Sequence, residues 1–271
     1  MSEVRITVLV ENEATAELGA EHGWAALVEA GGKRGLFDTG ESGLVVRNAR
    51  ALGVDLGSLD WIALSHGHYD HTGGLRAVLA QAGDVTVHAH PEALGEKLVR
   101  DLAGQWREAG MSVGRDEARF ECSPEPVALA EGVTLTGEVP RVTDYETVPD
   151  RFVTERDGRR VHDEFPDDQA LILATEGGLV VVLGCAHAGV VNTVLHAREI
   201  TGEERVRGVL GGMHLVSAPP ERIEKTIAAF REWEPELVGP AHCTGEEAVG
   251  AFRDAFGERC VACPGGTVLE F

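Results

Sequence analysis

Apolar and polar residues alternate over residues 4–10, and alternation of this kind predicts a half-buried strand. Residues 24–29, which run into a glycine pair, predict a second strand with a turn, and residues 35–37 predict a third. Apolar residues at helical spacing then predict a helix over residues 44–52, which a glycine closes. The N-terminal part of the chain is therefore expected to build a sheet.

A short apolar run at residues 61–64 predicts a buried strand that leads directly into a histidine-rich segment. Beyond it we predict helices over residues 73–82 and 91–109, the second with proline at its first turn, and a strand over residues 85–87. Residues 141–168 contain two prolines, many charges and no clear period, so we predict a long loop there. Loops of this length in compact domains are usually functional or disordered.

The C-terminal half begins with two apolar runs, 170–173 and 179–183, which flank Glu176-Gly177-Gly178 and predict a β-hairpin. Helices are predicted over residues 190–200, 220–233 and 246–256, and strands over residues 206–210, 237–239 and the C-terminal end. Strand-rich and helix-rich stretches thus alternate in two halves, which suits two sheets packed face to face with helices outside. No linker divides the chain, so we expect one domain over residues 1–271.

Composition narrows the classes of partner. No stretch approaches the roughly 18 apolar residues that span a bilayer, and the start, Met1-Ser2-Glu3-Val4-Arg5, has no basic region followed by an apolar core, so we expect a soluble, cytoplasmic protein. The odd count of five cysteines fits a reducing compartment. A formal net charge of −21 argues against nucleic acid or membrane as a partner and leaves a small-molecule substrate. The oligomeric state cannot be predicted.

The histidine-rich segment carries the candidate chemistry. His66 and His68 lie two residues apart after a strand, so an extended backbone would point both imidazoles to one side, where they can share a metal ion. Asp70 and His71 lie where the chain turns into a helix, directed at a neighbouring point. A solvated histidine-rich loop without metal is the alternative, but so dense a set of ligand-type residues would suit it poorly. We therefore predict two divalent transition metal ions, zinc first, with manganese, iron and nickel as alternatives.

Residues 65–74, SHGHYDHTGG, resemble the H-x-H-x-D-H signature of the metallo-β-lactamase superfamily, and residues 36–40, LFDTG, resemble the element that precedes it. Further blocks resemble one branch of that superfamily, which is similar to the archaeal 7,8-dihydropterin-6-methyl-4-(β-D-ribofuranosyl)aminobenzene-5′-phosphate synthase. These blocks are TGEVPR at 136–141, DDQAL at 167–171, GCAHAGVVNT at 184–193, GGMHL at 211–215 and HCTG at 242–245. The resemblance runs from about Val4 to the C-terminus.

The resemblance implies an α/β chain of the α+β type, folded as a four-layer αββα sandwich with the metals at one edge of the sheets. By position, His66 and His68 would bind the first metal, and Asp70 and His71 the second. Asp70 is also the candidate catalytic residue. His242 matches the final histidine ligand of the second metal.

Two departures from the common pattern concern the ligand set. Most superfamily members carry a bridging aspartate after the strand at 179–183, whereas this chain has Gly184-Cys185-Ala186-His187. The Gly-His element that usually supplies a third ligand to the first metal reads Thr136-Gly137-Glu138. We expect His187 to complete the first site, Cys185 to pack beneath it, and Glu138 or Cys185 to lie close by. Whether Cys185, His187 or Glu138 replaces the bridging aspartate stays open.

Several further residues are candidates to orient ligands or to meet the substrate. Asp38 is expected to orient a metal ligand rather than to bind metal itself. Asp168 is likewise a candidate to orient a ligand or to meet the substrate. Arg141 can hold a phosphate or carboxylate through its planar fork, with a surface salt bridge as the alternative. His214 is a candidate to meet substrate, with a structural role as the alternative. Cys260 and Cys263 lack a second ligand pair, so we interpret their C-x-x-C spacing as structural.

These residues predict a metal-dependent hydrolase. A bound divalent metal lowers the pKa of its water from about 15.7 to near 7, so a metal-bound hydroxide is the expected nucleophile. The resemblance points to a small, phosphorylated or pterin-like substrate, with a lactonase or cyclic phosphodiesterase as the alternative enzyme. A non-catalytic metal or ligand sensor is the alternative of another class, and the retained ligand set counts against it. We expect the loop at residues 141–168 to cover the metal pocket.

Overall fold

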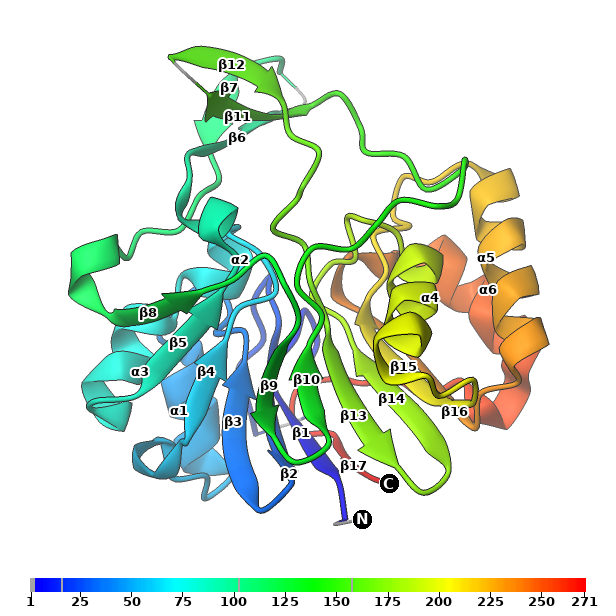
Figure 1. Cartoon of the computed structure of the whole chain (residues 1–271), viewed down its shortest axis with the longest axis horizontal. Coiled ribbons are helices and arrows are strands. Elements are labelled where there is room, and N and C mark those ends of the chain that lie inside the picture. The colour runs from blue at the N-terminus through cyan, green and yellow to red at the C-terminus, as the bar shows by residue number, and fades with distance from the viewer. Residues whose placement is uncertain (1–2, 16, 102, 157) are drawn as a thin grey trace.

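In the computed structural model of the protein, which describes residues 3–15, 17–101, 103–156 and 158–271, two β-sheets pack face to face and helices cover their outer faces (Figure 1). This arrangement confirms the four-layer αββα sandwich that the resemblance implied. Met1 and Ser2 are the first residues of the N-terminal segment that was expected to lack a basic region and an apolar core. They lie outside the described residues. None of the helices in the described ranges is long and apolar enough to cross a membrane.

The first sheet has the strand order β17-β1-β2-β3-β4-β5-β8. Its strands are β17 (Val268–Glu270), β1 (Arg5–Val10), β2 (Ala25–Ala30), β3 (Lys33–Phe37), β4 (Trp61–Ala63), β5 (Thr86–Ala89) and β8 (Arg119–Cys122). Helices α1 (Leu44–Ala51) and α3 (Leu75–Ala82) cover its outer face, where Val45 and Val78 pack with Leu27 and Leu36 of the sheet. The apolar stripe of each helix is thereby buried.

The second sheet has the order β16-β15-β14-β13-β10-β9. Its strands are β16 (Leu237–Ala241), β15 (Val206–Gly212), β14 (Gly178–Val182), β13 (Leu171–Thr175), β10 (Val133–Leu135) and β9 (Val127–Ala130), and its outer helices are α4 (Val190–Thr201), α5 (Pro220–Trp233) and α6 (Glu246–Phe256). In β14, Val180 and Val182 face the core between the sheets, whereas Leu179 and Val181 face the helices. Burial on both faces explains why this strand is apolar throughout.

A third sheet of order β12-β11-β6-β7 projects beyond one end of the sandwich, at the top of Figure 1. It consists of β6 (Lys97–Arg100), β7 (Trp106–Glu108), β11 (Phe152–Arg156) and β12 (Arg159–His162). We call this sheet the arm. The arm contradicts two sequence-based predictions. The described residues of 91–109, which leave out residue 102, form no α-helix, and those of 141–168, which leave out residue 157, include β11 and β12 and are not a plain loop.

The physical reason for the first correction is long-range pairing. Only the short 3-10 helix η2 (Pro91–Leu94) forms at the predicted helix start, and Gly95 and Gly104 are poor helix residues, at about 1 kcal/mol each relative to alanine. The residues between them pair instead with β11, in the register Phe152↔Val99 and Thr154↔Lys97. Local pattern could not reveal a partner more than fifty positions away.

Candidate metal centre

The histidine-rich segment leaves the end of β4 and enters the short helix α2 (Tyr69–Thr72). His68 is the extended residue before that helix, so His66 and His68 precede the turn, whereas Asp70 and His71 lie inside it. Gly67 between the two histidines is required by space, because a side chain there would clash with the carbonyl oxygen of Ala93. The chain bends over residues 65–67 and is extended at His68, so the expected extended backbone is present only in part before the turn into α2.

The first set of candidate ligands is His66, His68 and His187, whose donor atoms all lie within 4.8 Å of one another. All three side chains are buried, and neither Nε2 of His66 nor either ring nitrogen of His187 has a hydrogen-bond partner. Burial lowers the pKa of His66 and His187 well below the ordinary value and that of His68 to about 4. Three neutral imidazoles with unused lone pairs fit a transition metal ion.

The second set is Asp70, His71, Cys185 and His242, which also lie within 4.8 Å of one another. Nε2 of His71 is 3.2 Å from Nε2 of His242 and 3.2 Å from Sγ of Cys185, and Oδ2 of Asp70 is 3.3 Å from Nε2 of His242. The donor set combines carboxylate, imidazole and thiol, all buried. Such a set suits a second cation of the zinc type.

The position of Cys185 differs from the sequence-based expectation. His187 joins His66 and His68, as expected, but Cys185 lies beside His71 in the second set rather than packing beneath His187. The turn between them explains the separation, because Ala186 adopts a positive φ of 53° and sends the two side chains to different sets. Metal binding by either residue stays a prediction.

Asp38 lies behind the second set. Its Oδ2 is 2.7 Å from Nδ1 of His71 and accepts a hydrogen bond from Oγ of Ser65 at 2.7 Å, while Oδ1 accepts one from the Ser65 N–H at 2.7 Å. This contact leaves Nε2 of His71 directed at the set, which is the orienting position expected for Asp38. Burial opposes protonation of His71, but Asp70 and Asp38 raise its pKa to about 9.

Backbone strain concentrates at this site. Among the described residues, six that are not glycine have a positive φ, and Glu234, which follows helix α5, is the one outside the site. The other five carry or adjoin the candidate ligands: Asp38, Phe165, Ala186, His214 and His242. Strained conformations of this kind cost about 1–3 kcal/mol each and cluster at functional sites.

Of the other residues predicted from the sequence, Asp168 and Arg141 support the backbone around the site, Glu138 lies outside both sets, and His214 lies beside His187. Oδ2 of Asp168 accepts a hydrogen bond from the Ala188 N–H at 2.9 Å, so it supports the turn that carries His187. Arg141 donates to four backbone carbonyls, those of Glu146, Glu164, His187 and Ala188, and thus holds the chain around the site instead of presenting its fork to a substrate. Glu138 is largely exposed and lies 4.0 Å from His90, outside both sets, so it does not stand in for the bridging aspartate. His214 lies beside His187, with ring centroids 4.3 Å apart.

Sequence reasoning missed the aromatic cover of the first set. Phe165 stacks on His187 with ring centroids 3.8 Å apart, and Phe152 lies 5.6 Å from the ring of His68. Both residues belong to the segment 141–168, so two rings of that segment lie against the first set, and its role as a cover of the metal pocket stays a prediction. No periodicity marked these rings in advance, because they act from separate positions of an irregular segment.

His22 and Lys97 were also missed. Nε2 of His22 lies 3.3 Å from Oδ2 of Asp70, and its side chain is 54% exposed, so the second set is approached from solvent beside this residue. Lys97 is buried in the arm and its Nζ lies 2.9 Å from Asp163 and 2.6 Å from Asp167. Asp167 in turn accepts the Gly67 N–H at 2.9 Å, so this ion-pair group ties the arm to the histidine segment.

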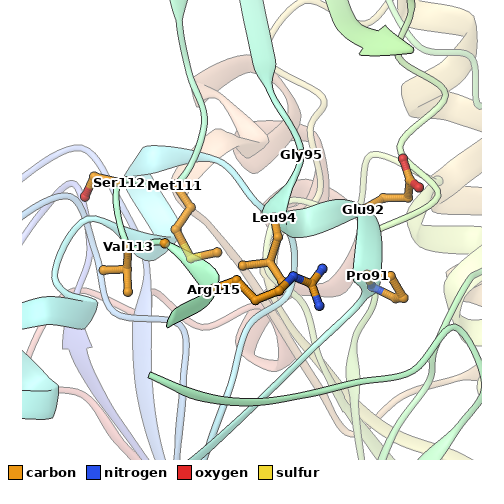
Figure 2. Close-up of a pocket in the computed structure, with 9 residues that line it drawn as sticks. Pro91, Glu92, Leu94, Gly95, Met111, Ser112, Val113 and Arg115 are labelled. Atoms are coloured by element: carbon orange, nitrogen blue, oxygen red, sulfur yellow. The ribbon is translucent and has the colours of Figure 1, made fainter. Parts of the chain in front are cut away.

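Two hollows lie outside the first set, and one of them is lined by His242 of the second set. One, of about 340 Å³, is bordered by Leu94, Met111 and Arg115, whose side chains lie close together in Figure 2. A larger cleft, of about 690 Å³, reaches the back of His242, where Glu11 accepts the His242 N–H at 2.7 Å. Neither is lined by a member of the first set.

Comparison with known proteins gives a consistent picture. Residues 18–199 match the metallo-beta-lactamase superfamily. The chain is 30% identical to the 7,8-dihydropterin-6-methyl-4-(beta-D-ribofuranosyl)-aminobenzene-5'-phosphate synthase of Methanocaldococcus jannaschii, over 99% of this chain and 97% of that one. It is 33% identical to an uncharacterized protein of the same organism, over 90% and 92%. A crystal structure described as a metal-dependent hydrolase of the beta-lactamase superfamily has a TM-score of 0.87 and 34% identity, with 99% of both chains covered.

Proposed function

The chain belongs to the metallo-beta-lactamase superfamily, and from this membership we propose that it hydrolyses an ester or phosphoester bond in a small, phosphorylated or pterin-like molecule with the help of two divalent metal ions. The observation that carries the proposal is the pair of buried donor sets at one edge of the sandwich. Zinc is the metal proposed first, because imidazole and thiolate donors both suit it.

His66, His68 and His187 would hold the first ion, and Asp70, His71, Cys185 and His242 the second. The orphaned nitrogens of His66 and His187 support this assignment, since buried polar atoms without partners are costly unless a ligand satisfies them. When bound, the ions supply a water of lowered pKa and a positive charge that polarises the scissile bond.

The chain's own groups would orient these parts and exclude water. Asp38 fixes the ring of His71, and Asp168 fixes the turn that presents His187. Phe152 and Phe165 close one side of the first set, whereas His22 stands at the open side next to Asp70. A reacting bond held between these two sides would be sheltered by the aromatic rings and reached by solvent beside His22.

One observation supports the substrate class. The Methanocaldococcus relative is named for a dihydropterin phosphate compound, and it aligns over nearly the whole chain. Phe152 and Phe165 are buried beside the first set and pack on each other and on His187, so they shelter the site and do not themselves select a planar ring. That relative is named a synthase, so hydrolysis by this chain is our proposal and does not follow from the name.

The test is a substrate panel incubated with zinc-loaded protein. The panel contains phosphomonoesters, linear and cyclic phosphodiesters, lactones and pterin phosphates, and the matched variant is Asp70→Asn. We expect turnover of at least one phosphoester, strongest for a pterin-like compound, and its loss in Asp70→Asn. If only lactones were turned over, the proposed phosphoester substrate would be wrong and the protein would be a lactonase. No turnover of any compound by fully metal-loaded protein would contradict the enzyme proposal and favour a sensor.

A further inference from the structure

A third group of potential ligands lies next to the second set. Cys185, His214 and Cys243 place one donor atom each within 4.8 Å of one another, and Cys185 belongs to both groups. Each of the three side chains is at most 9% exposed. They come from three connections at the same end of the second sheet: those after β14, β15 and β16. We call this group the thiol trio.

The imidazole of His214 has no hydrogen-bond partner at either nitrogen, although it is more than nine-tenths buried. Its backbone is held in a strained conformation with φ 46°, and its N–H is 3.3 Å from Sγ of Cys243. If this buried imidazole had only a structural role, its ring N–H would be expected to donate a hydrogen bond to a carbonyl or carboxylate oxygen. The chain instead directs this ring toward two sulfur atoms.

The polar contacts of the two thiols are few: Sγ of Cys185 lies 3.2 Å from Nε2 of His71, and Sγ of Cys243 accepts the His214 N–H. Cys243 contributes a weak contact of 3.6 Å to the Cys185 carbonyl, and a side chain on Gly212 would meet Sγ of Cys243, so the surrounding backbone leaves room for the sulfur atom. Two of the three donors of the trio are sulfurs, which are soft, whereas Asp70, His71 and His242 offer a carboxylate and imidazoles. Zinc sites use the same donor types; structural ones are closed by four protein ligands, whereas a site with three protein ligands leaves its fourth position to water or another ligand.

We propose that the thiol trio binds a third, soft divalent cation, with Cys185 bridging it to the second metal position. Both cysteines would bind as thiolates, each losing its proton to solvent as the ion enters. The two negative sulfurs would offset the repulsion between neighbouring cations. This inference goes beyond the proposed function, because it needs no turnover and involves His214 and Cys243, which that function does not use.

Cadmium is the probe, because it is soft and each thiolate–cadmium bond adds to an ultraviolet charge-transfer band. Metal-free full-length protein is titrated with Cd²⁺ while the band and the bound metal are measured together. Wild type is expected to take one equivalent more than Cys243→Ser. The band of Cys243→Ser should fall to roughly one third, since three sulfur–cadmium bonds become one. His214→Ala should keep the sulfur band at saturating Cd²⁺ but bind the last equivalent at least tenfold more weakly.

Cys122→Ser on β8 is the matched control and should behave as wild type, because this half-buried thiol belongs to none of the three groups. Cys243→Ala is titrated in parallel, with circular dichroism showing that both Cys243 variants are folded. Equal stoichiometry and equal band strength in wild type and folded Cys243 variants would overturn the third site. The result is independent of the proposed function, whose failure appears as absent turnover with the first two positions filled.

Discussion

Oδ2 of Asp38 lies 2.7 Å from Nδ1 of His71, and both side chains are fully buried. The contact selects which imidazole nitrogen faces Asp70 and His242, because the other nitrogen is occupied by the carboxylate. Gly184 has no side chain at the point where one would clash with Ser65, the second partner of Asp38. The orientation of His71 thus depends on residues from three connections of the fold.

Replacing Asp38 with asparagine should weaken the second metal position without emptying the first. The amide keeps the size of the side chain but removes the negative charge that orients His71, and losing such a partner typically costs roughly 10- to 100-fold in metal affinity. Stepwise zinc titration of metal-free protein measures this. Asp60→Asn, which alters a surface ion pair with Lys33, is the control and should leave both affinities unchanged. Equal zinc affinity in Asp38→Asn would show that the contact is structural only.

The stacked pair Phe165 and His187 predicts a role for the segment 141–168 in substrate binding. Phe165→Leu retains apolar volume but removes the flat ring, so KM should rise roughly 2- to 12-fold, the value of an aromatic contact. Metal content should stay constant. Trp106→Leu, at a partly exposed aromatic residue of the arm, should change neither quantity. A fall in metal content with unchanged KM would mean that the ring supports His187 and not the substrate.

Lys97 holds two buried carboxylates, so its removal should destabilise the protein. Lys97→Met leaves Asp163 and Asp167 without their cation, at a cost of about 3–5 kcal/mol in the free energy of unfolding. The exposed pair of Lys33 and Asp60 provides the control, because Lys33→Met should cost at most about 1 kcal/mol. Urea unfolding measures the loss in the free energy of unfolding for both variants. Adding Asp163→Asn and Asp167→Asn to Lys97→Met should restore part of the loss, and an undiminished loss would contradict the charge argument.

Much of the sandwich could be predicted from local pattern. The helices expected at 220–233 and 246–256 coincide with α5 and α6, and the apolar run at 179–183 gives β14 and the residue after it. These elements bury a continuous face, so periodicity determines them. The arm could not be predicted, because β6 and β11 are short, polar on one side and stabilised by pairing across the sequence. Strand β8 pairs with the distant β5, whereas β9 and β10 form a local hairpin of very short strands that the sequence pattern did not mark.

The site shows a similar division. The cluster from His66 to His71 is visible because its ligands are adjacent in sequence. His22 and Cys243 lie at the same centre, but the chain brings them there from distant connections. Arg141 was misjudged because its sequence surroundings do not show that four backbone carbonyls converge on its guanidinium group.

His187 and Cys185 should serve different ions. His187→Ala removes one of three imidazoles from the first set, whereas Cys185→Ser removes the thiol of the second, so each variant should bind fewer metal ions than wild type and lose a different one. A cysteine that only packed beneath His187 could be replaced by serine without loss of metal, whereas the 3.2 Å contact of Cys185 with His71 predicts a loss. Anomalous diffraction at the zinc edge would identify the lost position. Full occupancy of both positions in Cys185→Ser would exclude the thiol as a ligand.

The most direct test of metal-dependent hydrolysis is the rate on a chromogenic phosphodiester as zinc is added stepwise to chelator-stripped protein. If the two donor sets hold catalytic ions, the metal-free protein is inactive, and the rate rises with added zinc until both sets are filled. The His68→Ala and Asp70→Asn variants should remain folded and show no such rise. A rate that is independent of zinc, or equal in these variants and wild type, would contradict the account.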